Sequence, residues 1–300
     1  MEAGEYHFTN NKCTAGTGKG MIALQGKIVT REILCKTALS KTGIPGYEYC
    51  MNPYVGCVHG CIYCYASFMC RFTGHREKWG EFLDVKVNFP EALAKQLGSR
   101  RTRPEGRVLL GSVTDAYQPV EIRYEITRSV LKALADYQRL QVNILTKSDL
   151  VQRDLPLLQQ LQDCEVGFTI TTMDHKVARV LEPGAFLPNQ RIAAARKLVE
   201  ASVSVWVFIA PLLPGLSDSE ESLTDLLKTL HETGIEEILL DNLNPYPAVM
   251  HRLKTAYRQY FPGALPELEE YLSHPAIYRA KSQALLRQIS DFVGCRPYFI

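Results

Sequence analysis

From Arg107 onward, short apolar runs alternate with amphipathic helical segments, and this rhythm limits the possible folds more than any other feature. Buried strands are predicted over residues 107–113, 141–146, 165–171, 203–210 and 237–242. Helices are predicted between them, over residues 125–138, 149–162, 188–201 and 218–234. Such alternation is typical of a parallel sheet wrapped by helices.

A further strand over residues 48–56 gives six β/α units between residues 47 and 242. The predicted fold class is therefore α/β, a partial (β/α)6 TIM-like barrel of parallel strands. We expect an N-terminal extension over residues 1–45, the barrel over 46–243, and a helical C-terminal segment over 244–300 that packs on the barrel. The longest helix of that segment is predicted over 275–294, with Gly294 as its C-cap.

Composition narrows the function only a little. An apolar content of 46% and a charged content of 22% are ordinary for a globular protein. The net charge of +2 gives no electrostatic argument for nucleic acid binding, although it permits a local basic groove. The longest apolar stretch, residues 203–216, is broken by prolines and too short to span a bilayer. With no signal peptide visible at the start, we expect a cytoplasmic protein without a membrane partner.

Three cysteines, Cys57, Cys61 and Cys64, lie within eight residues after the first predicted strand. Three thiolates can bind three irons of a [4Fe–4S] cluster and leave the fourth iron open. The loop also follows the carboxyl end of a strand, where β/α barrels build their active sites. A zinc site is the alternative, and it needs a fourth ligand such as His59 or Cys70.

The spacing C-x3-C-x2-C, with Tyr63 before the last cysteine, resembles the signature of the radical S-adenosylmethionine (SAM) superfamily. The stretches "NPYVGCVHGCIYCYA", "SVTDAYQPVE" and "LEPGAFLPNQRIAAARKLVEA" resemble its spore photoproduct lyase-like branch, and the likeness covers about residues 37–247. The resemblance implies a radical SAM enzyme, lyase-like or modifying, in which the open iron chelates SAM. One-electron reduction by an external flavodoxin- or ferredoxin-like donor would then yield a 5′-deoxyadenosyl radical that takes hydrogen from a substrate.

The resemblance also assigns residues to the SAM site. Lys147 and Thr169, at the ends of two strands, would bind the SAM carboxylate, a role that suits a cation and a hydroxyl. Ala210 would leave room for the adenine, and Tyr63 would turn its backbone toward it. A lysine at a strand end can instead extend to solvent, and Tyr63 can simply pack within its loop.

Three further positions lie near the expected reaction. Tyr63 and Tyr65 preserve the spacing of two tyrosines thought to relay a hydrogen atom in the lyases, although core packing is the alternative for each. Asp115 would bind the ribose hydroxyls, orient a neighbour or cap a helix. Ser112, also expected beside SAM, aligns with the cysteine that returns hydrogen in the lyases. Because a serine O–H bond is much stronger than a thiol S–H bond, Ser112 cannot make that donation.

Glu182 and Arg191 are predicted to form a structural ion pair, and contact with a ligand is their alternative role. Of the remaining cysteines, Cys50 and Cys70 bracket the motif and, with Cys13 and Cys35, are weak candidates for a second cluster; Cys70 or Cys35 is also a candidate hydrogen donor.

Three functions stay open. The first is radical SAM chemistry on a nucleic acid or nucleotide-like substrate, and the second is the same chemistry on a small metabolite or peptide. The third is a non-catalytic Fe–S or zinc protein. A polyanionic substrate requires the basic residues of 100–107, and those at Arg252, Lys254 and Arg258, to surround the mouth of the barrel.

Overall fold

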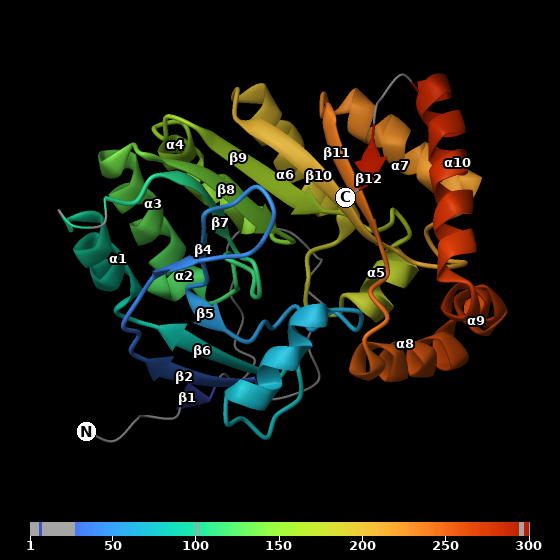
Figure 1. The fold of residues 1–300 in the computed structure, drawn as a ribbon, viewed down its shortest axis with the longest axis horizontal. Helices are drawn as coiled ribbons and strands as arrows, with labels where there is room; N and C mark the ends of the chain where they lie inside the picture. The colour runs from blue at the N-terminus through green and yellow to red at the C-terminus, as the bar shows by residue number, and fades with distance from the viewer. Residues whose placement is uncertain (1–5, 8–27, 100, 102, 294–296, 300) are drawn as a thin grey trace.

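The computed structural model describes residues 6–7, 28–99, 101, 103–293 and 297–299. Six parallel strands form the main sheet: β4 (Tyr49–Met51), β7 (Gly106–Leu110), β8 (Leu140–Thr146), β9 (Cys164–Thr169), β10 (Ser204–Leu212) and β11 (Glu237–Asn242). The antiparallel strand β3 (Leu39–Lys41) flanks β4, and the parallel strand β12 (Tyr298–Phe299) flanks β11. This sheet, curved and covered by helices in Figure 1, confirms the predicted partial α/β barrel.

Helices pack on the outer face of the sheet because the strands turn apolar side chains toward them. These side chains include Val108, Leu110, Val142, Ile144 and Val166, all almost fully buried in one core. The covering helices are α1 (Phe89–Leu97), α3 (Ile126–Tyr137), α4 (Leu155–Leu158), α6 (Pro188–Glu200), α7 (Glu220–Glu232) and α10 (Pro275–Val293).

The inner face of the barrel is more polar. Parallel register places Cys50 beside Leu109 and Leu109 beside Asn143 on this face. The Trp206 indole donates a hydrogen bond to the Asn143 side-chain oxygen at 3.2 Å, so a polar contact helps to fill the interior.

A second, four-stranded sheet was not foreseen. It contains β1 (Tyr6–His7), β2 (Val29–Ile33), β6 (Phe82–Lys86) and β5 (Tyr54–Val55) in that order, and it stands apart from the main row of strands in Figure 1. The prediction of one strand over residues 48–56 is therefore wrong, because β4 joins the barrel while β5 pairs with β6. Pro53 lies between them and has no N–H to offer a continuous ladder.

The predicted helix over residues 149–162 is also interrupted. A 3₁₀ segment, η2 (Asp149–Asp154), leads into the four-residue helix α4. Pro156 lies in the first turn of α4, where a missing N–H is tolerated, but within one long helix it would remove a hydrogen bond.

The C-terminal segment contains α8 (Pro247–Tyr260), the 3₁₀ turn η3 (Pro262–Ala264), α9 (Leu265–Ser273) and α10 before it returns to the sheet as β12. Gly294 lies outside the described residues, and the division of the chain at residues 45 and 243 stays a prediction. Helix α8 lies beside α5 (His175–Leu181), and α9 lies between α8 and α10, in Figure 1. Leu253 and Tyr257 of α8 share a second buried core with Leu181 and with Cys61 and Tyr63 of the cysteine loop. Among the described residues, no helix is both long enough and apolar enough to cross a membrane.

Candidate active site

The cysteine loop, residues 57–64, connects β5 to the 3₁₀ helix η1 (Tyr65–Phe72). Two successive turns shape it: the Gly60 N–H donates to the Cys57 carbonyl at 3.2 Å, and the Cys64 N–H donates to the Cys61 carbonyl at 3.1 Å. Gly60 has a φ of +59°, which favours glycine. At Gly184 any side chain would collide with the loop, because a Cβ there would lie 2.1 Å from the Val58 carbonyl oxygen.

The three thiols of the loop are close enough to act on one another electrostatically. Burial raises the pKa of Cys57 and Cys61 to about 12 and that of Cys64 to about 11, and the neighbouring negative charges add to the rise. Thiolates at these positions therefore need a strong local positive charge, which the irons of a cluster would supply.

The donor set fits a cluster better than a single ion. In the part of the chain that the structure describes, no three His, Cys, Asp or Glu side chains are placed to hold one metal ion. A cubane cluster needs a less compact set of ligands, because each thiolate binds a different iron and the three sulfurs stay farther apart. His59, a candidate fourth ligand for zinc, has its Nδ1 3.4 Å from an Asp115 oxygen, and its buried Nε2 has no hydrogen-bond partner among the described residues.

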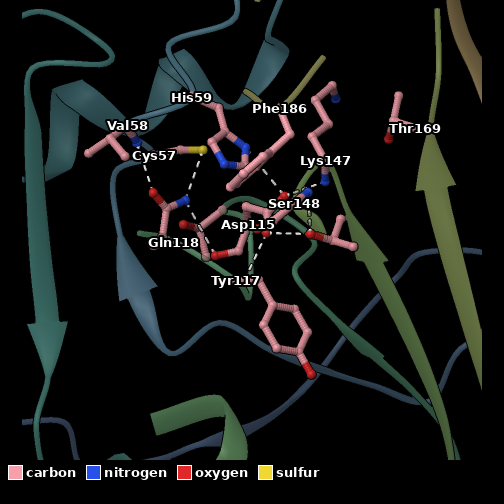
Figure 2. A network of polar contacts seen from close by, with 12 residues as sticks. Cys57, Val58, His59, Asp115, Tyr117, Gln118, Lys147, Ser148, Thr169 and Phe186 are labelled. Atoms are coloured by element: carbon pink, nitrogen blue, oxygen red, sulfur yellow. Dashed lines mark hydrogen bonds and ion pairs between the residues drawn. The ribbon is translucent and has the colours of Figure 1, made fainter. Parts of the chain in front are cut away.

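The Asp115 carboxylate connects the loop after β7 to the end of β8 through hydrogen bonds. Its Oδ1 accepts hydrogen bonds from the Tyr117 N–H at 2.8 Å and the Thr146 hydroxyl at 2.7 Å, and its Oδ2 accepts from the Lys147 N–H at 2.7 Å. Figure 2 shows these bonds joining the loop after β7 to the end of β8. Both oxygens are thus engaged within the chain, an arrangement that orients neighbours.

The sequence patterns did not indicate a role for Gln118. It is fully buried, and its side-chain N–H donates to the Cys57 sulfur at 3.0 Å while its oxygen accepts from the Val58 N–H at 3.0 Å (Figure 2). No spacing rule links it to Cys57, which lies sixty-one residues earlier. A buried amide beside a thiolate is a means of tuning an iron–sulfur cluster.

Lys147 and Thr169 lie just beyond and at the carboxyl ends of neighbouring strands, β8 and β9. The Lys147 ammonium lies 5.7 Å from the centre of the Tyr63 ring, so it turns toward the cysteine loop. Burial lowers its pKa, but the negative charges of Cys61 and Glu182 outweigh this, and the net pKa is raised. Lys147 therefore stays a cation, as a carboxylate ligand requires.

The predicted ion pair between Glu182 and Arg191 is confirmed, and both side chains are almost fully buried. Arg191 also donates to the Thr169 carbonyl at 2.9 Å, and Glu182 accepts hydrogen bonds from the hydroxyls of Tyr63 and Thr171. This network connects the end of β9 to the cysteine loop, and it occupies the Tyr63 hydroxyl.

Tyr65 and Ser112 meet on the outer side of the loop. The Tyr65 hydroxyl donates to the Ser112 carbonyl at 2.6 Å, and the Asn52 side chain donates to the Ser112 hydroxyl at 2.8 Å. Tyr65 is 45% exposed, so of the two tyrosines it is the one that faces solvent at the mouth of the barrel. Ala210 is half-buried near the end of β10, before Pro211.

The basic residues do not gather around this mouth. Arg101 and Arg103 precede β7 and therefore lie at the amino ends of the strands, where Arg107 pairs with Glu165 at 3.2 Å. Arg252 alone among the basic residues named for the C-terminal segment contacts the site, donating to the Ser67 hydroxyl at 2.8 Å and the Cys64 carbonyl at 3.3 Å. The ring of basic residues that a polyanionic substrate requires is thus largely missing among the described residues.

The other cysteines give no sign of a second cluster. Cys35, Cys50, Cys70 and Cys164 are free thiols, and none of them belongs to a group of three His, Cys, Asp or Glu side chains placed to hold a metal ion in the described ranges. Cys70 lies within η1 and Cys50 within β4. Cys13 lies outside the described residues.

Comparison with known proteins supports an iron–sulfur cluster as the cofactor. A family model described as the radical SAM superfamily matches residues 51–227. An uncharacterized protein of Methanocaldococcus jannaschii is 36% identical over 197 residues, which cover 66% of this chain and 73% of that protein. An uncharacterized protein of Mycobacterium tuberculosis is 30% identical over 268 residues, which cover 80% of this chain and 78% of that protein.

Among solved structures, a spore photoproduct lyase complexed with dinucleoside spore photoproduct has a TM-score of 0.63 and 18% sequence identity. The match covers 90% of this chain and 82% of that one. At this identity the likeness concerns the fold alone.

Proposed function

Because the chain belongs to the radical SAM superfamily, we propose that it takes a hydrogen atom from a nucleotide-like substrate bound at the mouth of its barrel. The family binds a [4Fe–4S] cluster and SAM, which together supply a 5′-deoxyadenosyl radical as the hydrogen acceptor. The observation that carries the proposal is the meeting of two buried thiols, Cys57 and Cys61, and the half-buried Cys64 with a charged lysine at the carboxyl ends of the strands.

The chain's own residues would bind and orient the two cofactors. Cys57, Cys61 and Cys64 would hold three irons, and Gln118 would fix the sulfur of the first. Lys147 and Thr169 would hold the SAM carboxylate, with Lys147 kept in place through its backbone by Asp115. Ala210 would leave space for the adenine.

Tyr65 is the residue proposed to face the substrate. It is half-exposed beside the loop, whereas Tyr63 is buried and held by Glu182. Ser112 cannot return hydrogen as a thiol would, so we do not propose the photoproduct lyase reaction. The proposal is limited to hydrogen abstraction that modifies or rearranges a substrate.

A nucleotide-like substrate is supported by two aromatic side chains at the mouth. Tyr65 is 45% and Tyr246 is 51% exposed, and the two phenols are near enough to influence one another electrostatically. Exposed aromatic rings stack on planar bases. A long polyanion is disfavoured, because Arg101 and Arg103 lie at the opposite end of the barrel.

A small metabolite or peptide is the second candidate, favoured by that same shortage of positive charge. In either case the reaction needs a one-electron reductant, for which we propose a flavodoxin- or ferredoxin-like protein. The free cysteines suit the reducing cytoplasm as the location. A purely binding role does not agree with membership of an enzyme family.

The proposal is tested by anaerobic reconstitution with iron and sulfide, followed by incubation with SAM and dithionite. We expect 5′-deoxyadenosine from the wild type and none from a Cys57→Ala, Cys61→Ala, Cys64→Ala variant. Cys164→Ala, at the amino end of β9, is the matched control and should keep its cluster and its product. A wild type that binds iron and SAM but yields no product with cell extract as substrate source would contradict the proposal.

A further inference from the structure

A cavity of about 170 Å³ lies beside the cysteine loop. Its walls include Asn52 and Gly56 from the segment before Cys57, Val113 from the loop after β7, and Met69 from η1. Lys86, the last residue of β6, completes the wall. The cavity is thus built by the segments that enter and leave the cluster loop.

The cavity is held in place by contacts that also shape the active site. The Asn52 side chain accepts a hydrogen bond from the Val113 N–H at 3.0 Å and donates to the Ser112 hydroxyl at 2.8 Å. The Thr114 hydroxyl donates to the Gly56 carbonyl at 2.5 Å. Any molecule in this cavity therefore lies next to Ser112 and to the loop that carries the cysteines.

Lys86 is the charged group of the cavity. Its ammonium donates to the Asn52 carbonyl at 2.7 Å and lies 5.7 Å from the centre of the Phe89 ring. Among the described residues, no Asp or Glu pairs with it. An ammonium has three N–H donors, so a single neutral carbonyl leaves most of its hydrogen-bonding capacity unused and gives its charge no ion-pair partner.

The electrostatic state of Lys86 agrees with a missing anion. Burial lowers its pKa, and the thiols of Cys35 and Cys50 oppose this only in part. A half-buried cation without a counter-ion is costly, and a bound anion would remove that cost.

We propose that this cavity binds an oxyanion group of the substrate, a phosphate or a carboxylate, with Lys86 as its counter-ion. The inference rests on the proposed function, since it names the part of the substrate that the site recognises. A volume of about 170 Å³ suits such a head group and a few further atoms, and the rest of the substrate would extend into the mouth of the barrel.

Isothermal titration of the anaerobically reconstituted enzyme with inorganic phosphate, acetate and thymidine 5′-monophosphate tests the proposal. We expect at least one anion to bind, and Lys86→Met to weaken that binding about tenfold or more, as for a lost charge-assisted hydrogen bond. Lys86→Arg should restore most of it. Preference for phosphate would indicate a nucleotide-like substrate, and preference for acetate a carboxylate-bearing metabolite or peptide.

Two controls separate this proposal from its alternatives. Lys95→Met, at an exposed lysine of α1, should leave anion binding unchanged. SAM affinity should also be unchanged in Lys86→Met, and a loss there would assign Lys86 to SAM and overturn the proposal. Equal anion affinity in wild type and Lys86→Met, or no anion binding at all by a folded wild type, would overturn it as well. SAM cleavage to 5′-deoxyadenosine, measured separately, reports on the proposed function independently of Lys86.

Discussion

Two lysines at the mouth of the barrel stand in opposite electrostatic settings. Lys147 faces the Glu182 carboxylate and the sulfurs of Cys61 and Cys64, and the negative charge of the carboxylate and of the thiolate forms raises its pKa despite burial. Lys86 has a single carbonyl as its hydrogen-bond acceptor among the described residues, and burial lowers its pKa. The comparison suggests that one lysine belongs to a finished cofactor site and the other to a site completed by a ligand.

The surroundings of the two lysines differ in the same way. Around Lys147, the side chains of Tyr63, Glu182 and Arg191 are buried and bonded to one another. Around Lys86 there is a cavity, whose walls include Asn52, Met69 and Val113. A cofactor used in every turnover can have a rigid site, whereas a substrate that enters and leaves needs an open one.

The largest expected effect concerns the buried network of side chains around Lys147. Glu182→Gln removes the charge that pairs with the buried Arg191, so we expect a loss of about 3–5 kcal/mol in the free energy of unfolding. Chemical denaturation of the apoprotein measures it. Glu270→Gln, which breaks the exposed pair with Lys281, is the control and should show no measurable change. Equal stability of the two variants would mean that the buried network is not the rigid element.

The same pair predicts a pH dependence. Burial raises the pKa of Glu182, but Arg191 and Lys147 outweigh burial, and the net pKa lies below its ordinary value of 4.5. A carboxyl with a depressed pKa stabilises the fold fully above its unfolded pKa and loses that contribution as pH falls through its folded pKa. The stability difference between wild type and Glu182→Gln should therefore shrink below about pH 4.5. A difference that stays constant down to complete acid unfolding would contradict this assignment.

Next in size is the effect of Lys147→Met on SAM. Removal of the cation should weaken SAM binding about tenfold to a hundredfold, because a charge-assisted hydrogen bond is lost. Equilibrium binding to the cluster-loaded protein measures it, with Lys86→Met as the matched control. If Lys147→Met and Lys86→Met weaken SAM binding equally, the proposed difference between a cofactor site at Lys147 and a ligand site at Lys86 is wrong.

The smallest change concerns Gln118. In Gln118→Met the side chain keeps its length but loses the N–H that donates to the Cys57 sulfur. Hydrogen bonds to sulfur raise the reduction potential of a cluster, so the potential should become more negative while iron content is kept. A redox titration followed by electron paramagnetic resonance measures the shift. Gln159→Met, at an exposed glutamine just after α4, should leave the potential unchanged.

Features encoded in short stretches of the chain could be predicted from the sequence. The parallel strands, the three cysteines of one loop, and the pair of Glu182 and Arg191 nine residues apart are all of this kind. Lys86 and Gln118 carried no such signal, because their meaning comes from contacts with Asn52 and Cys57, thirty-four and sixty-one residues away. The strand over residues 48–56 failed for a related reason, since Pro53 lets the chain change sheets and periodicity does not reveal where.

The central claim, that Cys57, Cys61 and Cys64 hold a cluster and Lys147 binds SAM beside it, is tested most directly by a SAM titration. The reduced, cluster-loaded protein would be titrated and followed by electron paramagnetic resonance. We expect a [4Fe–4S] signal that changes as SAM binds, at much higher SAM concentration in Lys147→Met than in Lys86→Met. A cluster signal that is unaffected by SAM, or a protein that binds no cluster through the three cysteines, would contradict the claim.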